Sequence, residues 1–286
     1  MTIDFSSLTP REAYAYLSAA VAPRPICFAS TVAADGTINL SPYSFFNVVS
    51  GDPPMMVFAP QLSGRDGSSK DTLDNVLAVP EVVINVVNHA LVEQMSLTST
   101  AYPADVNEFV KAGLTQVPSD VIKPPRVGES PVAFECIVDR VIALGDGPMA
   151  GNMVLARAVR VHVREEYLTE GKLDPTLLDL VGRMGGSDYV RASGAALFEI
   201  PKPIRTLGIG VDALPDHIRN SDVLTGNDLG RLGNLEQLFT SREAEIIVKQ
   251  EKLSWDKGGG VKVKHELAKS LLRGGSVKEA LAVLLS

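Results

Sequence analysis

Residues 41–47 read SPYSFFN and bring hydroxyl groups, an amide and three aromatic rings into one short segment. An irregular segment of this kind on a scaffold of strands can turn backbone amides and short polar side chains toward a flat polar ligand. The same residue types also fit a structural loop whose rings fill the core. The segment is therefore a candidate binding site, with both interpretations open.

A second candidate is Lys70-Asp71-Thr72, which predicts the start of a helix that runs to about residue 79, capped by Asp71 or Ser69. A phosphate at a helix N-terminus meets free amides and the positive end of the helix dipole. Lys70 adds a positive charge there, Thr72 adds a hydroxyl donor, and Arg65 could join them. Any helix can begin with such residues, so this motif alone does not establish a phosphate site.

A third candidate is Arg24, which lies between Pro23 and Pro25. The two prolines favour an extended backbone and hold the arginine in place at the start of a strand. Its guanidinium is either part of a surface salt bridge or directed at a ligand.

Strands must position these residues. Two apolar runs, 26–33 and 55–59, are typical of buried strands, and Asp35-Gly36 predicts a turn between the first run and a shorter one at 38–40. Pro42 cannot donate to a sheet ladder, so no central strand is expected there.

Further strands are predicted over 81–87, 132–144 and 153–163. Strands of this length with irregular connections suit a barrel better than a doubly wound sheet. The motif from Thr9 to Glu12 predicts the capped start of a helix, and residues 173–184 predict another short helix.

Many separate motifs then carry a resemblance, in order along the chain: PRPI-x-FASTVAADG-x-x-N-L-SP-x-SFFN-x-VS-x-DPP, S-x-KDT-x-x-N over 69–75, and GRMGGSDYVR over 182–191. Over about residues 23–203 the sequence resembles the flavin reductase-like, FMN-binding split-barrel family. The resemblance implies a mainly β fold with peripheral helices (α+β), an FMN-binding split β-barrel, and a homodimer with FMN at or near the subunit interface.

The resemblance also implies where FMN binds. Lys70 and Thr72 are expected at the phosphate. Ser44, Asn47 and the backbone amides of 41–46 are expected at the polar edge of the isoalloxazine, assisted by Ser30 and Thr31. The full predicted cofactor set is Arg24, Ser30, Thr31, Ser44, Phe45, Asn47, Lys70, Asp71 and Thr72, with no catalytic side chain assigned. Arg183, Tyr189 and Arg191 are candidates either for the rim of the pocket or for salt bridges between subunits.

The function expected from the resemblance is NAD(P)H-dependent reduction of flavin by hydride transfer, with an oxygenase as a possible partner. Many members of the family carry Gly-Asp-His near the nicotinamide, where this chain reads Gly151-Asn152-Met153. This departure and the long C-terminal extension favour one alternative, an FMN-dependent oxidoreductase acting on another organic substrate. A second alternative is a non-enzymatic FMN-binding or redox-sensing protein.

From residue 204 to 286 the composition changes, and a C-terminal extension with a helical hairpin follows the expected barrel of 1–203. Thr240 to Glu243 and Ser276 to Glu279 predict capping boxes. Apolar side chains such as Ile246, Leu271 and Leu281 would be exposed on an isolated hairpin. The extension is therefore expected to be a packing or dimerisation arm that docks on the barrel or on a partner subunit.

Composition excludes other classes. With 286 residues, 45% hydrophobic content and a net charge of −7, the chain has no basic field for nucleic acid or an anionic membrane. No apolar run approaches the ~18 residues of a membrane span, and the N-terminus does not read as a signal peptide. The four histidines and two cysteines lack metal-ligand spacing. Cys27 and Cys136 lie in apolar runs, and buried free thiols fit a cytoplasmic protein.

Overall fold

The computed structural model describes residues 1–200, 207–256 and 259–286, and the chain divides between Phe198 and Glu199 into two compact units. The boundary expected at residue 203 lies outside the described residues. Each unit has a hydrophobic core of its own and is described separately.

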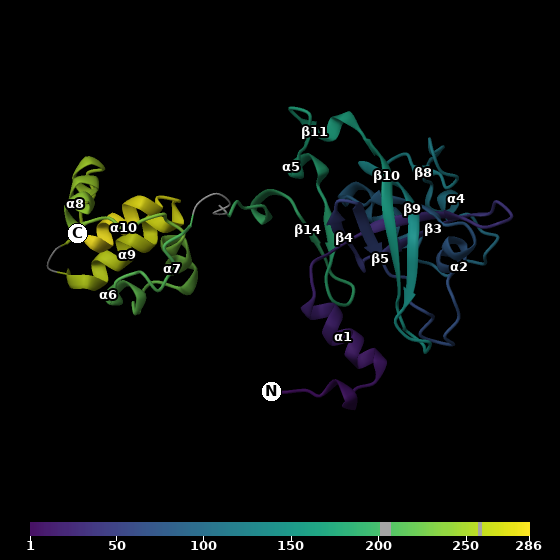
Figure 1. Ribbon diagram of the computed structural model, residues 1–286, viewed down its shortest axis with the longest axis horizontal. Coiled ribbons are helices and arrows are strands. Elements are labelled where there is room, and N and C mark those ends of the chain that lie inside the picture. Colours follow the sequence, from purple (N-terminus) through teal and green to yellow (C-terminus); the bar gives the residue numbers. More distant parts are fainter. Residues whose placement is uncertain (201–206, 257–258) are drawn as a thin grey trace. The chain divides into compact units, whose positions relative to one another are not determined.

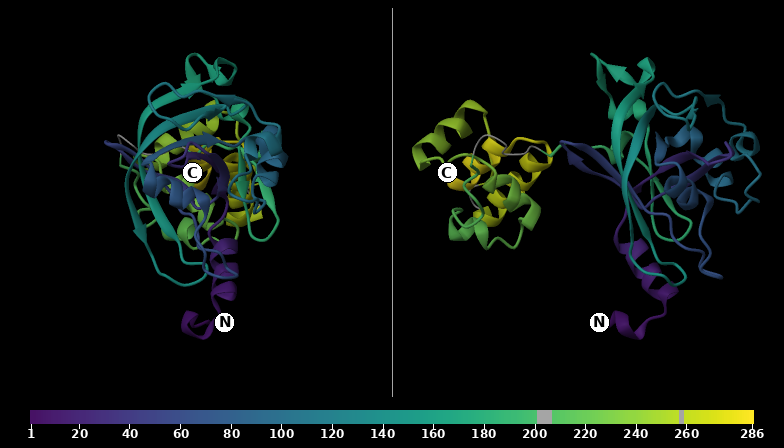
Figure 2. Two further views of the ribbon diagram at one scale, coloured as in Figure 1. Left: turned by 90° about the vertical axis from the view of Figure 1, so that its right-hand side faces the viewer. Right: turned by 45° about the vertical axis from the view of Figure 1, so that its right-hand side comes forward.

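A seven-stranded antiparallel sheet forms the centre of the first unit, with the strand order β3-β2-β6-β9-β10-β5-β4 (Figure 1). Its curvature can be followed in the two views of Figure 2. The strands are β2 (Cys27–Val32), β3 (Ile38–Tyr43), β4 (Phe46–Gly51), β5 (Pro54–Phe58), β6 (Glu81–Val86), β9 (Val132–Ala143) and β10 (Asn152–Val163). The strands predicted from the apolar runs are confirmed.

Both faces of this sheet are covered, because successive side chains along its strands belong to two different hydrophobic clusters. Along β2, Cys27 and Ala29 belong to one cluster, whereas Ile26 before the strand and Phe28 within it belong to the other. Side chains on a strand point to opposite faces in turn, so a strand buried on both sides is apolar without alternating in polarity. This explains why residues 26–33 read as a continuous apolar run.

Three smaller sheets complete the strands of this unit. The three-stranded sheet joins β1 (Arg24–Pro25), β13 (Val181–Arg183) and β14 (Tyr189–Arg191). The two-stranded sheets are β7 (Gln116–Val117) with β8 (Arg126–Val127), and β11 (Leu168–Thr169) with β12 (Lys172–Leu173). At Gly182 a Cβ atom would lie only 2.8 Å from the Cβ of Pro23, so this glycine allows β13 to approach β1 closely.

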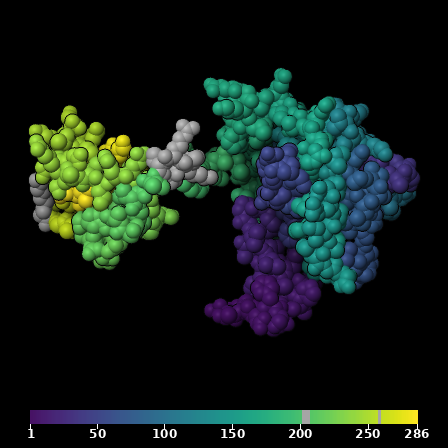
Figure 3. Space-filling model, viewed as in Figure 1, coloured from purple at the N-terminus to yellow at the C-terminus, as the bar shows by residue number. Residues whose placement is uncertain are grey.

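The helices of the first unit are α1 (Pro10–Ala20), α2 (Asp71–Ala78), α3 (Val92–Leu97), α4 (Glu108–Ala112) and α5 (Pro175–Leu178). The predicted capping box of α1 is confirmed, since Thr9 and Glu12 bond each other's backbone N–H groups. Figure 3 shows α1 projecting from the rest of its unit. Tyr16, Leu17 and Val21 on or next to this helix are exposed.

Two predictions about elements were wrong. The helix predicted over 173–184 ends at Leu178, because Asp179 adopts a left-handed conformation (φ 48°) and the chain then enters β13. The segment 41–47 is mostly strand rather than irregular, since β3 runs through Pro42 to Tyr43 and β4 begins at Phe46. Pro42 is tolerated because β3 is an edge strand, bonded to a neighbour on one side only.

The second unit contains five helices within the described residues. They are α6 (Asp216–Arg219), α7 (Gly226–Gly233), α8 (Ser241–Gln250), α9 (Gly260–Arg273) and α10 (Val277–Leu285). The capping box at Thr240 is confirmed, whereas Ser276 makes no capping bond with its side chain. Among the described residues, no helix combines the length and apolar character that crossing a bilayer requires.

These helices bury a core around Leu232, Leu272 and Leu281, against which Leu271 packs. The extension is thus more than a hairpin, and most of the apolar side chains that motivated docking are covered by its own helices. Ile246 remains exposed. Docking of the extension on another surface stays a prediction.

Candidate flavin-binding site

An aromatic pocket of about 130 Å³ lies where β3 ends and β4 begins. It is lined by Tyr14, Pro42, Tyr43, Ser44, Phe45, Ala59, Gln61 and Lys70. The rings of Tyr14 and Phe45 are tilted against each other with centroids 6.0 Å apart. The pocket therefore offers aromatic surface together with a hydroxyl, a side-chain amide and an ammonium group.

A polar pocket of about 350 Å³ adjoins it and shares Pro42 and Lys70 with the aromatic pocket. Its walls come from the end of β3, the loop before α2, and residues 98–104. They carry many hydroxyl groups and two basic side chains: Ser41, Ser63, Ser68, Ser69, Thr98, Ser99, Thr100, Tyr102, Arg65 and Lys70. The two pockets are neighbours that share two lining residues, and together they are called the cleft, with an aromatic end and a basic, hydroxyl-rich end.

Lys70 lies at the N-cap of α2, where no side chain caps the helix. The predicted caps were wrong: Ser69 instead donates a hydrogen bond to Asp74 Oδ1 at 2.6 Å, and Asp71 lies inside the first turn. An uncapped N-terminus leaves amide groups available to an anion in the pocket. Asp71 also lines the polar pocket, where its carboxylate partly offsets the charge of Lys70.

Thr31 and Thr72 lie beneath the cleft instead of lining it. Both are almost completely buried, and the Asn39 amide donates to Thr72 Oγ1 at 2.8 Å and to Thr31 Oγ1 at 3.3 Å. The Asn75 amide donates to the same Thr31 oxygen at 3.1 Å. Asn39 itself lines the polar pocket, so this network joins the floor of the pocket to β2 and α2.

Ser30 is also completely buried, but it lies on the opposite face of β2 from Thr31. It shares that face with Phe28. Its hydroxyl has no hydrogen-bond partner among the described residues. Asn47 is exposed on β4, and its Oδ1 accepts the backbone N–H of Val48 at 2.8 Å. Neither residue lines the cleft.

Arg24 lies behind the cleft, where it contacts the lining residue Phe45. Its guanidinium donates to the carbonyl oxygens of Ser18, Val21 (2.6 Å) and Met184 (2.8 Å), so it holds the C-terminal end of α1. The guanidinium carbon also lies 5.8 Å from the centroid of the Phe45 ring. The proline-flanked arginine is therefore buried and bonded to backbone instead of forming a surface salt bridge, and it is not among the residues that line the two pockets.

Glu108, which was not among the predicted residues, closes another side of the polar pocket. It is buried at the start of α4, and one carboxylate oxygen accepts the Leu40 backbone N–H at 2.9 Å. Burial raises the pKa of this carboxyl above its ordinary value, although the Leu40 hydrogen bond opposes the rise. The residue fastens β3 to α4 next to the pocket.

Gln61, also not predicted, connects the aromatic pocket to the Gly151-Asn152-Met153 segment. Gln61 and Gly151 form an isolated antiparallel bridge, and the Gln61 side chain donates to the Met149 carbonyl at 3.2 Å. Asn152 is buried, and its side-chain amide nitrogen has no partner within the described residues. The departure from Gly-Asp-His thus lies beside the aromatic end of the cleft.

The three other candidates, Arg183, Tyr189 and Arg191, lie on the β13–β14 hairpin and form contacts within their own chain. Arg183 donates to the Tyr189 hydroxyl and to the Gly186 carbonyl. Arg191 forms a bidentate pair with Asp179, with both contacts at 2.7 Å. These side chains stabilise the hairpin and do not line the cleft.

A separate group of charged side chains is Asp120, Glu135 and His162, whose ligand atoms lie within 4.8 Å of one another. The carboxylate of Glu135 accepts the backbone N–H groups of Asp120 and Val121 at 2.8 Å, and lies 2.6 Å from His162 Nε2. Asp120 pairs with Arg160 at 2.7 Å. These contacts describe a hydrogen-bonded network that fastens the loop after β7 to β9.

Comparisons with known proteins agree with this geometry. Residues 19–186 match the model of the "Flavin reductase like domain" family. Nitrilotriacetate monooxygenase component B from Bacillus cereus is 30% identical (TM-score 0.66), and the alignment covers 70% of this chain and 98% of that one. The 2-nitrobenzoate 2-nitroreductase NbaA of Pseudomonas fluorescens is 29% identical (TM-score 0.63), covering 73% and 100% of the two chains.

A Shewanella frigidimarina protein with a split barrel domain shares the fold at 24% identity and a TM-score of 0.59, covering 71% of this chain and 99% of that one. The family match, residues 19–186, lies within the first unit, where the cleft lies. The fold is therefore the expected split barrel with peripheral helices, and the chain belongs to the flavin reductase-like family.

Proposed function

We propose that the chain binds FMN in the cleft and catalyses its reduction by NADH or NADPH through hydride transfer. The observation that carries the proposal is that an aromatic pocket and a basic, hydroxyl-rich pocket adjoin, because these two ends match the ring system and the phosphate of FMN. Lys70 lines both ends.

In this arrangement Lys70, Arg65 and the uncapped N-terminus of α2 bind the phosphate, and hydroxyl groups such as Ser41 and Ser69 bind the ribityl chain. Ser44, Gln61 and the backbone between β3 and β4 address the polar edge of the ring, whose N–H and carbonyl groups need both acceptors and donors. Phe45, held by Arg24 and Tyr14, supplies apolar contact.

FMN, when bound, supplies the ring that accepts the hydride, and one proton completes the reduction. The protein positions the nicotinamide against that ring and donates hydrogen bonds where negative charge develops. No nucleophile is needed for this chemistry, and the cleft lining contains no cysteine or histidine among its described residues.

The assembly we propose is a homodimer in the cytoplasm, with an oxygenase as a possible acceptor of reduced flavin. The exposed Leu17 and Val21 on α1, together with Val48 and Val49 on β4, offer apolar surface to a second subunit. The component B named above belongs to a monooxygenase, which supports an oxygenase partner. Cys27 and Cys136 are free and buried, and burial raises the pKa of Cys136 to about 12.

An absorbance spectrum of the purified protein and a steady-state assay of NAD(P)H oxidation with added FMN test this proposal. Flavin absorbance and rapid turnover that saturates with FMN are the expected results. Protein that fails to retain FMN in either a spectrum or a titration would contradict the proposal.

A second function is an FMN-dependent oxidoreductase acting on another organic substrate. It is favoured by Asn152, which stands where many relatives have the acid of Gly-Asp-His, and by the similarity to a nitroreductase. Bound FMN that is reduced slowly by NAD(P)H, with turnover only after an organic acceptor is added, would identify this activity. Bound FMN without turnover of either kind would indicate a non-enzymatic flavin-binding or redox-sensing protein.

A further inference from the structure

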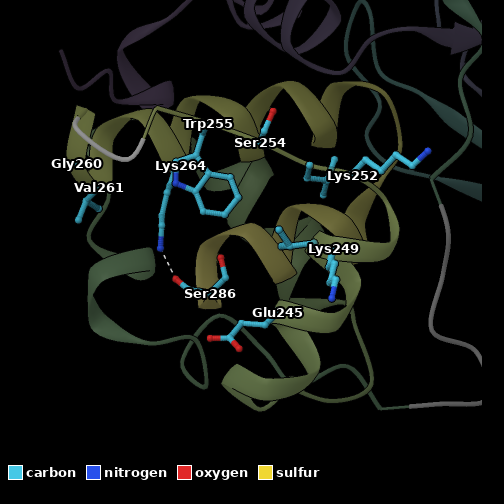
Figure 4. A pocket seen from close by; sticks show the side chains of 11 residues that line it. Glu245, Lys249, Lys252, Ser254, Trp255, Gly260, Val261, Lys264 and Ser286 are labelled. Atoms are coloured by element: carbon cyan, nitrogen blue, oxygen red, sulfur yellow. Dashed lines mark hydrogen bonds between the residues drawn. The ribbon is translucent and has the colours of Figure 1, made fainter.

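A cavity of about 790 Å³ lies in the C-terminal unit, outside the residues that match the flavin reductase model (Figure 4). Its walls come from the last turns of α8, the following residues to Trp255, the start of α9 and Ser286. Ligand sites in proteins commonly measure about 300–1,000 Å³. The cavity is therefore large enough for a small organic molecule.

One wall of this cavity is aromatic and held in place. Trp255, the only tryptophan of the chain, is half-buried, and the Lys264 ammonium lies 5.4 Å from its ring centroid. Lys264 also donates to the Ser286 carbonyl oxygen, as Figure 4 shows. Anchoring Lys264 at one end fixes the cation against the indole, and Val248 and Leu253 add apolar surface.

The other notable feature is an excess of positive charge. Lys249, Lys252 and Lys264 line the cavity with one acidic side chain, Glu245, and Lys264 is bound to the main-chain oxygen of Ser286. In Figure 4 the side chains of Lys249 and Lys252 extend away from the Trp255 ring, and neither forms an ion pair within the described part of the chain. The cavity therefore combines an aromatic wall with exposed lysines at its rim.

The backbone at Lys252 gives independent support. Lys252 has φ 53°, a left-handed conformation that favours glycine, and the next N–H, from Leu253, bonds the Val248 carbonyl at 2.9 Å. Glycine is common where a helix ends in this way. A lysine here keeps an ammonium at the rim of the cavity in spite of the backbone strain.

We propose that the C-terminal unit binds a small aromatic anion in this cavity. The ring packs against Trp255, and the carboxylate or sulfonate group of the ligand lies near Lys249 and Lys252. Both the charge contact and the apolar contact stabilise the bound anion. A neutral ring of the same size lacks the charge contact and therefore binds more weakly. This second site is independent of FMN binding in the first unit.

The full chain can be tested with 8-anilinonaphthalene-1-sulfonate as the probe, read through quenching of Trp255 fluorescence. Its uncharged relative N-phenyl-1-naphthylamine serves as the neutral comparison. We expect saturable quenching by the sulfonate at concentrations where the neutral compound has little effect. Lys249→Gln should weaken sulfonate binding by about three- to tenfold, as loss of one partly exposed charge contact predicts.

Lys252→Gly provides the sharper variant, because it removes the charge while relieving the left-handed strain. It should weaken sulfonate binding by a similar factor without lowering the midpoint of thermal unfolding. Lys278→Gln, at an exposed lysine of α10 outside the cavity, and Lys70→Gln, in the first unit, should leave the quenching unchanged. Equal binding of both probes, or equal affinities in all four variants, would overturn the proposal.

Discussion

The Asn39 side chain donates a hydrogen bond to Thr72 Oγ1 across 2.8 Å, which joins β3 to α2 beneath the proposed flavin site. Thr72 is buried, so this contact determines where the first turn of α2 lies relative to the strand. The position of the residues proposed to bind the phosphate thus depends on a hydrogen bond at the floor of the pocket.

Asn39→Ala should therefore lower both stability and FMN affinity. It leaves the buried Thr72 hydroxyl without its amide donor, which costs about 1–3 kcal/mol of unfolding free energy. Urea unfolding and FMN titration measure the two effects. Asn47→Ala is the stability control, because Asn47 is exposed and bonds only the adjacent Val48 N–H among the described residues. Equal stability of the two variants would contradict the role of the network.

Lys70→Ala should weaken FMN binding by at least about tenfold and riboflavin binding little. FMN carries a phosphate of about −1.5 to −2 charge that riboflavin lacks, and a charge-assisted contact contributes about 1.5–3 kcal/mol. Isothermal titration with both ligands gives the comparison, with the exposed Lys172→Ala as control. Equal losses for FMN and riboflavin would show that the phosphate binds elsewhere.

Arg24→Lys should destabilise the first unit by about 1–3 kcal/mol, since a lysine cannot reach the carbonyls of Ser18, Val21 and Met184 in the same planar geometry. Loss of the planar guanidinium beside the Phe45 ring should also weaken FMN binding. Thermal unfolding and flavin titration follow both quantities. Arg11→Lys, at an exposed position of α1, should change neither. An unchanged melting temperature in the Arg24 variant would refute the anchoring role.

Glu135 predicts a pH dependence of stability. Burial raises the pKa of its carboxyl, but hydrogen bonds from the Asp120 backbone, His162 and the Val121 backbone outweigh burial, so the pKa is below its ordinary value. A depressed folded pKa means that the stabilisation is present above the unfolded pKa of about 4.3 and is lost as the pH falls through the folded value.

Glu135→Gln should thus cost about 1–3 kcal/mol at pH 7 and flatten the acid side of the stability curve. Urea unfolding at a series of pH values between 7 and the acid limit of solubility measures it. The exposed Glu165→Gln should reproduce the unmodified curve. A Glu135 variant with undiminished acid sensitivity would assign that sensitivity to other carboxyl groups.

Much of the barrel was predictable from local patterns, because β9 and β10 are long and the residues of β10 alternate clearly. The predicted site was less complete. Ser44, Phe45, Lys70 and Asp71 line the cleft as expected, since a short segment between strands and a helix start expose their own side chains. Thr31 and Thr72 do not, because the face of a strand or helix on which a residue falls depends on tertiary packing.

Arg24 shows the same limit. Two prolines predicted an immobile arginine, and it is immobile, but its direction is determined by the carbonyl of Met184, 160 residues further along the chain. Asn39 and Glu108 had a usable signal, since polar residues within apolar surroundings at strand and helix positions indicate buried hydrogen bonds. The five-helix core of the second unit could not be read from its capping motifs alone.

The position of Pro42 on the edge strand β3 has a consequence for how the protein behaves at high concentration. An open strand edge can pair with the edge of another molecule and start an aggregate, and a residue without an N–H interrupts that pairing. Pro42 lies on this edge strand and also lines both pockets of the cleft. Replacing Pro42 would therefore favour self-association through the strand edge and would also alter the pocket.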